Sequence, residues 1–228
     1  INFQTPSIIF GMDTLNQVGI EAKKLGAKKV LFVTGPNVQK NGFVEKVESL
    51  LEKESIEVKV VMPSRNTPEP TTDIPEELKD VAKEMGADLV IGMGGGSVLD
   101  VAKMTAALIN NPLTVREYFG KEKVPNKGLP TILIPSTSGT GSEVTKHAIF
   151  LDEKANVKKA VASSNLLPTV AIIDPLTTIT CPQKVTADSG FDAFLHAAEP
   201  FISKSANPLT DVIALEAISM ITKWIGPA

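Results

Sequence analysis

Short apolar runs rich in valine and isoleucine alternate along this chain with longer segments whose apolar residues recur at helical spacing. The runs lie at 29–34, 56–62, 88–92, 130–134 and 170–174. Runs of this kind are typical of parallel strands that are covered on both faces. One intervening helix carries Leu78 and Ala82 on one face, and we expect it to begin at Asp73 as N-cap, with Glu76 completing a capping box. The alternation predicts an α/β fold, with a parallel Rossmann-like sheet and helices on both faces.

The pattern changes after residue 181. From Lys184 onward there is no strand-like run, and two apolar helices are expected at 187–203 and 209–224. We therefore predict an α/β domain at 1–181, followed at 182–228 by the first helices of an incomplete all-helical domain. Two helices cannot cover their own apolar faces, so several side chains need partners unless the sheet domain covers them. These side chains are Val212, Leu215, Ile218, Met220 and Ile221.

Composition excludes several classes of protein. No apolar stretch in the 228 residues approaches the roughly 18 to 20 that a membrane span needs, so no membrane partner is expected. The net charge of −3, with both signs interspersed, gives no electrostatic footprint for nucleic acid. Cys181 is the only cysteine, which precludes an internal disulfide and favours a cytoplasmic location.

A glycine-rich turn follows the run at 88–92. Gly94, Gly95, Gly96 and Ser97 lie between that run and a helical segment. Backbone N–H groups and a helix N-terminus can together hold a phosphate, and glycine permits both close approach and the positive φ that such loops use. The simpler interpretation is a tight strand-to-helix turn without a ligand.

A second polar loop, at 135–143, follows the run at 130–134 and combines five hydroxyl side chains with two glycines. Ligands of parallel sheets bind at the carboxyl ends of the strands, so the two loops together favour an elongated diphosphate ligand over solvated turns. The first strand is followed by Thr34-Gly35-Pro36-Asn37 instead of G-x-G-x-x-G. That departure disfavours a standard Rossmann dehydrogenase.

Asp192 and His196 are four residues apart in the first predicted helix after 181. They would share one face, where a carboxylate and an imidazole can bind one cation or simply pair with each other. A catalytic metal usually has at least three protein ligands, and the only other histidine is His147. We interpret His147 as a packing or cofactor-lining residue, and Cys181 as structural.

Three stretches, in this order, resemble the iron-containing (group III) alcohol dehydrogenase family. They are GGGSVLDVAK at 94–103, PSTSGTGSE at 135–143 and ADSGFDAFLHAAE at 187–199. The first also resembles sister lineages, the glycerol dehydrogenases and dehydroquinate synthases, and the third discriminates against them. The family pairs a sheet domain that binds NAD(P) with a helical domain that carries a metal.

Residue by residue, the resemblance implies a cofactor site and half of a metal site. Gly94 and Asp100 belong to the cofactor motif. Gly95, Gly96 and Ser97 would hold the pyrophosphate, Thr137, Ser138 and Thr140 would line the nicotinamide side, and Lys158 would reach a ribose. Asp192 and His196 would be catalytic as two of four metal ligands. The other two family ligands are histidines further along, so we expect this chain to be the N-terminal part of a longer enzyme.

The implied activity is oxidation of a primary or secondary alcohol, or reduction of the aldehyde or ketone, by hydride transfer with NAD or NADP. A divalent metal, Fe²⁺ or alternatively Zn²⁺, would polarise the substrate oxygen. Many family members carry an aspartate after Val-Thr, where this chain has Gly35. Because that carboxylate would repel a 2′-phosphate, its absence predicts tolerance of NADP, and Lys40 is near enough in sequence to approach the phosphate.

Assembly and alternative functions complete these expectations. The strand at 3–10 would leave an open sheet edge, and family members commonly dimerise there, so we expect a homodimer. One alternative is a polyol or polyol-phosphate dehydrogenase, or a dehydroquinate-synthase-like lyase, of the sister lineages. Another is an inactive nucleotide-binding fragment, because half of the implied metal ligands are missing from this sequence.

Overall fold

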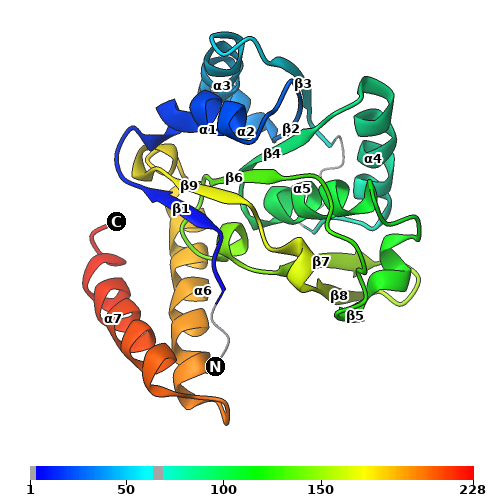
Figure 1. The fold of residues 1–228 in the computed structure, drawn as a ribbon. Coiled ribbons are helices and arrows are strands. Elements are labelled where there is room, and N and C mark those ends of the chain that lie inside the picture. The colour runs from blue at the N-terminus through cyan, green and yellow to red at the C-terminus, as the bar shows by residue number, and fades with distance from the viewer. Residues whose placement is uncertain (1–3, 64–68) are drawn as a thin grey trace.

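The computed structural model describes residues 4–63 and 69–228. Its centre is a six-stranded sheet in the order β1-β9-β6-β4-β2-β3, in which every pairing is parallel (Figure 1). The strands are β1 (Ser7–Phe10), β2 (Lys29–Val33), β3 (Glu57–Val61), β4 (Leu89–Gly94), β6 (Thr131–Pro135) and β9 (Val170–Ile173). The predicted parallel sheet is confirmed, and the five predicted runs from 29 to 174 coincide with strands to within two residues. The strand expected at 3–10 is shorter than predicted: β1 begins at Ser7, residues 4–6 are not in a strand, and residue 3 lies outside the described residues.

Helices cover both faces of this sheet. α4 (Asp73–Met85) and α5 (Gly96–Leu108) lie on one face, and α1 (Val18–Lys24) and α3 (Phe43–Glu52) lie on the other (Figure 1). Alternate residues of β2 supply the two cores: Leu31 and Val33 pack toward α4 and α5, whereas Val30 and Phe32 pack toward α1 and α3. A strand exposes successive side chains to opposite faces, so an unbroken apolar run is what a sheet covered on both sides requires.

The predicted capping box at the start of α4 is wrong. Asp73 is the first helical residue, Thr72 is the N-cap, and no side chain makes a capping hydrogen bond there. Glu76 instead accepts a hydrogen bond from the backbone N–H of Val115 at 2.9 Å. The Glu76 carboxylate, which the sequence pattern assigned to a cap, thus binds a segment about 40 residues away along the chain. Asp73 still lies in the first turn, where a negative charge favours the helix dipole.

A second, three-stranded sheet lies beside the first. It contains β5 (Gly120–Lys121), β7 (His147–Asp152) and β8 (Val157–Ala162), in the order β5-β8-β7. β7 and β8 form an antiparallel hairpin, whose turn includes Asn156 at a φ of 50°. None of these three strands is among the runs predicted from sequence. Asn156, directly before Val157, was a turn signal that could have indicated the hairpin.

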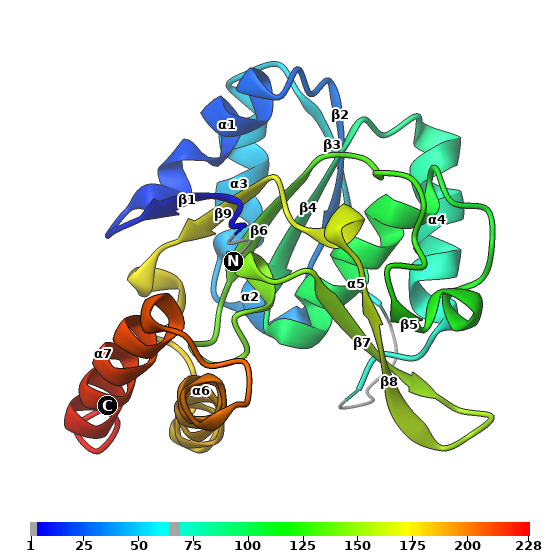
Figure 2. The ribbon, with the colours of Figure 1, turned by 60° about the horizontal axis from the view of Figure 1, so that its bottom comes forward.

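The last two helices are α6 (Gln183–Ile202) and α7 (Pro208–Trp224), which lie side by side outside the sheet layers (Figure 2). α6 begins four residues before the predicted start, directly after Pro182, and Asn207 caps α7 through the N–H groups of Leu209 and Thr210. Their contact is close, because a Cβ on Gly190 would lie 2.1 Å from Cδ1 of Ile225.

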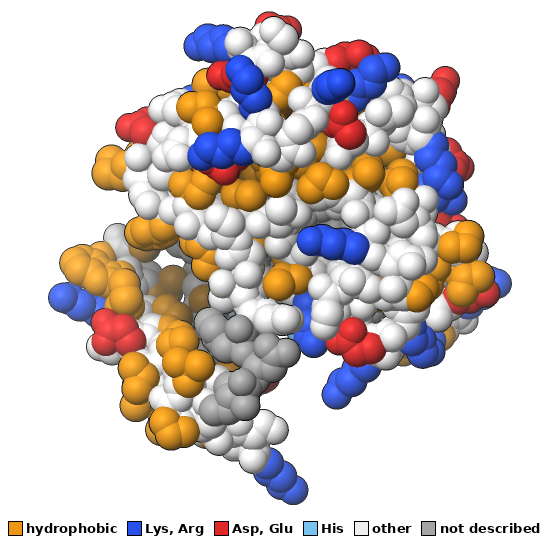
Figure 3. Space-filling view, in the orientation of Figure 1, with side chains coloured by type: hydrophobic (Ala, Val, Ile, Leu, Met, Phe, Trp, Pro, Cys, Tyr) orange, Lys and Arg blue, Asp and Glu red, His pale blue; other side chains and the backbone are white. Residues whose placement is uncertain are grey.

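Much of the apolar surface of α6 and α7 remains exposed (Figure 3). Of the five residues predicted to need partners, Val212, Leu215 and Met220 are exposed, and Ile218 and Ile221 are half-buried. Neither the sheet nor α6 covers them fully. Within residues 4–63 and 69–228, no helix has both the length and the apolar character that a membrane span requires.

Candidate functional site

The two polar loops predicted from sequence lie side by side. β4 and β6 are neighbouring parallel strands in which Gly94 is paired with Pro135, so the segments that follow them leave the sheet at the same point. The N–H of Ser136 donates to the carbonyl oxygen of Gly94 at 2.9 Å. The glycine loop (94–97) and the hydroxyl loop (135–143) therefore form one surface at the carboxyl edge of the sheet.

Space explains the glycine at position 96. A Cβ there would lie 2.7 Å from both Cγ2 and Oγ1 of Thr140, closer than side-chain atoms normally approach. The positive φ expected for this loop is absent, since none of Gly94, Gly95 and Gly96 has one. Gly95, the N-cap of α5, is extended, with φ −72° and ψ 174°. The glycines thus permit a close approach of two chain segments, and the left-handed conformation is not required.

The N-terminus of α5 opens onto this surface. Gly95 offers no side chain to cap the helix, and the first turn carries no acidic residue. The first N–H groups of a helix, together with its dipole, favour an anion at this position. The start of α5 is therefore chemically suited to a phosphate group.

Two clefts meet at the start of α5. The first cleft has a volume of about 700 Å³ and the second about 680 Å³, and each is within the range of small-molecule sites. Ser97 lines both clefts. The clefts thus form a two-part depression that an elongated ligand could span across the N-terminus of α5.

The structure distributes the predicted cofactor residues over these two clefts. The second cleft is lined by Gly35, Gly94, Gly95, Ser97 and Thr137, and the first by Gly96, Ser97, Asp100, Thr140 and Lys158. Ser138 is exposed and lines neither of them. Residues separated by more than 120 positions in sequence are thereby brought to one surface.

The charged side chains among these residues, Asp100 and Lys158, have partners within the protein. Asp100 is buried, and both of its carboxylate oxygens have protein partners. Lys158, on β8, forms an ion pair with Glu69, with 2.5 Å between Nζ and Oε1. This pair is largely exposed to solvent, so it would exchange readily with a ligand.

Asp192 and His196 lie one turn apart on α6 and face the first cleft. His196 Nε2 is 3.7 Å from Asp192 Oδ1, and the two side chains are 50% and 42% exposed. α6 is held close to the hydroxyl loop, because a Cβ on Gly139 would lie 2.6 Å from the carbonyl oxygen of Ser189. This approach brings the aspartate–histidine pair to the same cleft as Ser97 and Thr140.

The aspartate–histidine pair offers two possible donors to a metal ion. Its donors, a carboxylate and an imidazole, are suitable ligands for iron or zinc. In the part of the chain that the structure describes, however, no three His, Cys, Asp or Glu side chains are grouped so that they could hold a metal ion. A metal bound here would need ligands from elsewhere.

His147 and Ile149 also line the first cleft, and of the two only His147 was considered from sequence. They project from the same face of β7, whose alternate residues Ala148 and Phe150 are buried. Partial burial lowers the pKa of His147, and the nearby Lys103 and Lys146 ammonium groups lower it further. The lowered pKa favours the neutral imidazole, which can both donate and accept a hydrogen bond. The alternation of β7 was the signal that could have placed Ile149 beside it.

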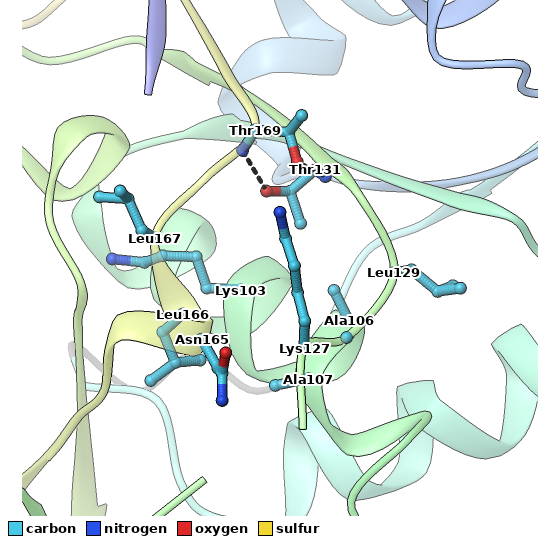
Figure 4. Close-up of a pocket in the computed structure, with 11 residues that line it drawn as sticks. Lys103, Ala106, Ala107, Lys127, Leu129, Thr131, Asn165, Leu166, Leu167 and Thr169 are labelled. Atoms are coloured by element: carbon cyan, nitrogen blue, oxygen red, sulfur yellow. Dashed lines mark hydrogen bonds between the residues drawn. The ribbon is translucent and has the colours of Figure 1, made fainter. Parts of the chain in front are cut away.

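A third cavity, between α5 and the segment before β9, is too small to be a ligand site (Figure 4). Its volume is about 10 Å³, roughly the space of one water molecule. Lys127 extends toward Thr131 and Thr169, and the N–H of Thr169 donates to Oγ1 of Thr131 at 3.3 Å. The candidate site is therefore the pair of large clefts.

A parallel sheet with ligand-sized clefts at its carboxyl edge is the architecture of α/β proteins that bind an extended ligand across that edge. The family model described as iron-containing alcohol dehydrogenase matches residues 5–175. The C-terminal model of the Fe-containing alcohol dehydrogenase family matches residues 186–227. The chain belongs to the iron-containing alcohol dehydrogenase family.

Known relatives agree over nearly the whole of this chain. Sulfoacetaldehyde reductase of Bilophila wadsworthia is 38% identical over 221 residues, which cover 97% of this chain and 57% of the relative. Long-chain-alcohol dehydrogenase 1 of Geobacillus thermodenitrificans is 42% identical over 221 residues, covering 96% and 55%. The crystal structure of NADH-dependent butanol dehydrogenase A from Thermotoga maritima has a TM-score of 0.91 at 33% identity, covering 100% of this chain and 57% of that one. The chain thus spans little more than half the length of these relatives.

Proposed function

We propose that this chain forms the cofactor-binding part and half of the metal site of an NAD(P)-dependent, metal-dependent alcohol dehydrogenase. The enzyme would interconvert a small primary or secondary alcohol and its aldehyde or ketone. The observation that carries the proposal is the meeting of the glycine loop, Thr140 and the Asp192–His196 pair at the first cleft. We further propose the division into a nucleotide-binding domain at 1–181 and the start of a metal-binding helical domain at 182–228.

The start of α5 would hold the cofactor diphosphate. Gly95, Gly96 and Ser97 present backbone N–H groups there, and Gly96 allows Thr140 to approach. Thr137 and Thr140 would orient the nicotinamide from the hydroxyl loop, whereas the exposed Ser138 would make at most a peripheral contact. Lys158 would exchange Glu69 for a ribose hydroxyl.

When bound, NAD(P) would accept or donate the hydride, and Fe²⁺ or Zn²⁺ would polarise the substrate oxygen. Asp192 and His196 would hold the metal together with ligands that are not among the described residues. Ile149 and His147, which line the same cleft, would limit the access of water to the reacting carbon. The chain's own contribution is therefore orientation and exclusion of water.

NADP is proposed as an accepted, and preferred, cofactor. Gly35 and Lys40 both line the second cleft. A Cβ at position 35 would meet only Cγ2 of Val98, at 3.9 Å, so the space beside the turn is open. A neutral turn with a nearby lysine favours a 2′-phosphate, which a carboxylate at this position would repel.

Nucleotide binding without turnover is a second candidate for the 228-residue chain by itself. The observation in its favour is that the described residues contain no complete group of metal ligands. After dialysis without added metal, we expect this chain to retain well under one equivalent of iron or zinc by elemental analysis. Stoichiometric metal would contradict this and require a different ligand set.

Assembly and location remain proposals as well. β1 forms an edge of the main sheet, and Ile8 and Phe10 on it are exposed. An open edge with apolar side chains favours pairing with a second copy, so we propose a homodimer in the cytoplasm. Light scattering of the complete enzyme at micromolar concentration tests the dimer, and a monomer would count against it.

Two neighbouring glycines give the matched test of nucleotide binding. In the complete enzyme, Gly95→Ala should leave the melting temperature unchanged, because the nearest atom to its Cβ is 3.7 Å away. The added methyl group should hinder the approach of the diphosphate to the backbone N–H groups. We therefore expect the dissociation constant of NADPH to rise about tenfold, which corresponds to about 1.4 kcal/mol of binding free energy. Gly96→Ala should lower the melting temperature as well, through its contact with Thr140. Unchanged NADPH and NADH titrations with Gly95→Ala would refute the proposed diphosphate site.

A further inference from the structure

Lys103 is a buried lysine for which the proposed chemistry has no role. It lies in the second turn of α5, and its side chain is 0% exposed. Burial lowers the pKa of Lys103, while the Asp100 carboxylate opposes that shift. Because a buried ammonium group is costly unless it is paired and hydrogen-bonded, its contacts indicate what it is for.

All of the contacts of Lys103 point toward the clefts. Its Nζ lies 3.0 Å from Oδ1 of Asp100 and donates to the carbonyl oxygen of Ser142 at 2.9 Å. It also donates to the carbonyl oxygen of His147. An ammonium group has three donors, and here one is directed to each of three segments: α5, the end of the hydroxyl loop and the start of β7.

Asp100 completes the network. Its Oδ1 accepts a hydrogen bond from Oγ of Ser142 at 2.5 Å, and its Oδ2 accepts one from the N–H of Ile149 at 2.9 Å. The pair is thus bonded on one side to the loop that contains Thr137 and Thr140. On the other side it is bonded to the strand that carries His147 and Ile149 into the first cleft.

We propose that Lys103 is a positioning residue: with Asp100, it fixes the hydroxyl loop and the cleft face of β7 relative to the N-terminus of α5, at the spacing that the nucleotide requires. This inference rests on the proposed function of the site. It assigns Asp100 to the same positioning role, since its oxygens are occupied by protein groups.

Stability alone is a poor explanation for this pair. Replacing a buried ion pair by apolar residues of similar volume often leaves a protein equally stable or more stable, because desolvation offsets the attraction. α5 is otherwise largely apolar, and its residues Leu99, Met104 and Leu108 belong to the core on this side of the sheet, so a methionine at position 103 would suit the composition of the helix. What an apolar side chain cannot do is bond the carbonyl groups of Ser142 and His147.

The test compares three variants of the complete enzyme. Lys103→Met removes the ammonium donors and leaves the Asp100 carboxylate without its ion-pair partner. The double variant Asp100→Asn/Lys103→Met has no unpaired charge but still lacks the ammonium donors. Leu108→Ala is the control, because Leu108 is buried at the far end of the same helix. Fluorescence titration with NADPH and NADH gives the dissociation constants, and melting temperature and amide hydrogen exchange of residues 136–150 report on structure.

We expect Lys103→Met to raise the dissociation constant of the preferred nucleotide roughly tenfold or more, as misplacement of binding groups does. The double variant should recover melting temperature but not affinity, and exchange at 136–150 should be faster in both. Leu108→Ala should lower melting temperature with affinity within twofold of wild type. If the double variant binds like wild type, or if Leu108→Ala weakens binding as much as Lys103→Met, the positioning role is wrong.

A milder variant covers the case in which Lys103→Met does not fold. Ser142→Ala removes only the hydroxyl bonded to Asp100, and it should give a smaller loss of affinity with faster exchange at 136–150. Wild-type affinity and exchange in Ser142→Ala would overturn the inference. Failure of the wild-type enzyme to bind either nucleotide would instead refute the proposed function, and with it the inference.

Discussion

α5 and α7 are both apolar helices, of 13 and 17 residues, yet they differ strongly in how much of their surface is buried. Ten residues of α5 are buried, including its aspartate and lysine, whereas Ala214 is the only buried residue of α7. α5 lies between the main sheet, α4 and β7, while α7 packs against α6 and leaves Val212 69% exposed. Apolar composition alone does not bury a helix, because burial requires covering layers on more than one side.

The same difference divides the candidate site. The glycine and hydroxyl loops are supported by buried strands and by α5, whereas Asp192 and His196 stand on α6, which packs against α7 and approaches the hydroxyl loop but has few buried residues. Sites on rigid, well-packed elements hold their geometry most closely. We therefore expect the proposed nucleotide-binding part of the site to tolerate distant changes better than the proposed metal-binding pair.

The largest expected effect comes from one substitution made in both helices of the 228-residue chain. Leu108→Ala in α5 should lower the free energy of unfolding by about 2–5 kcal/mol, because Leu108 is fully buried. Leu215→Ala in α7 should change it by no more than about 0.5 kcal/mol, because Leu215 is 51% exposed. Urea denaturation measures both values. Equal losses would show that α7 is covered in solution, for example by a second copy.

The second largest expected effect tests whether the choice between NAD and NADP depends on the sheet region. In the complete enzyme, Gly35→Asp should lower kcat/KM for NADP relative to NAD by about 1–3 kcal/mol, or roughly 5- to 150-fold, the scale of one close like-charge contact. Gly26→Asp is the control for an added charge, because Gly26 lines neither cleft and a Cβ there meets no atom within 4 Å. Its φ of 78° makes the substitution strained, but strain of the fold should lower kcat/KM for both nucleotides and leave their ratio unchanged. Wild-type preference for NAD by tenfold or more would contradict the interpretation of Gly35.

The smallest effect concerns acid stability. Hydrogen bonds from Lys159 and, to a smaller extent, Arg116 lower the pKa of Asp152 from 3.8 to about 2. Because this pKa is depressed in the folded state, the carboxylate contributes stability that is complete above its unfolded pKa and is lost as pH falls through about 2. Asp152→Asn should therefore lower the melting temperature at pH 6, and the difference from wild type should shrink steadily between pH 4 and about 2.

Asp188→Asn in α6 is the control for that experiment. Its ion pair with Lys184 is highly exposed, and such pairs contribute little. We expect its melting temperature to follow wild type at every pH. If Asp188→Asn changed the melting temperature with pH as much as Asp152→Asn does, the effect could not be assigned to the hydrogen bonds of Asp152.

Local sequence determined the main sheet, the helices on both faces and the two polar loops that follow β4 and β6. Unbroken apolar runs can be satisfied only in strands covered on both sides, and loops that follow parallel strands must converge on one edge. The grouping of Ser97, Thr140, Asp192 and His196 at one cleft is consistent with the family motifs. Their roles in binding remain predictions.

Only the tertiary structure decided how polar groups are partnered. Glu76 pairs with Val115 instead of capping its own helix, and Asp100 faces Lys103, Ser142 and Ile149 instead of open space. The need for Gly96 likewise comes from Thr140, 44 positions away along the chain. Periodicity reports which side of an element is apolar, but a hydrogen bond or a steric limit depends on which distant segment arrives there. That information exists only once the strands have paired.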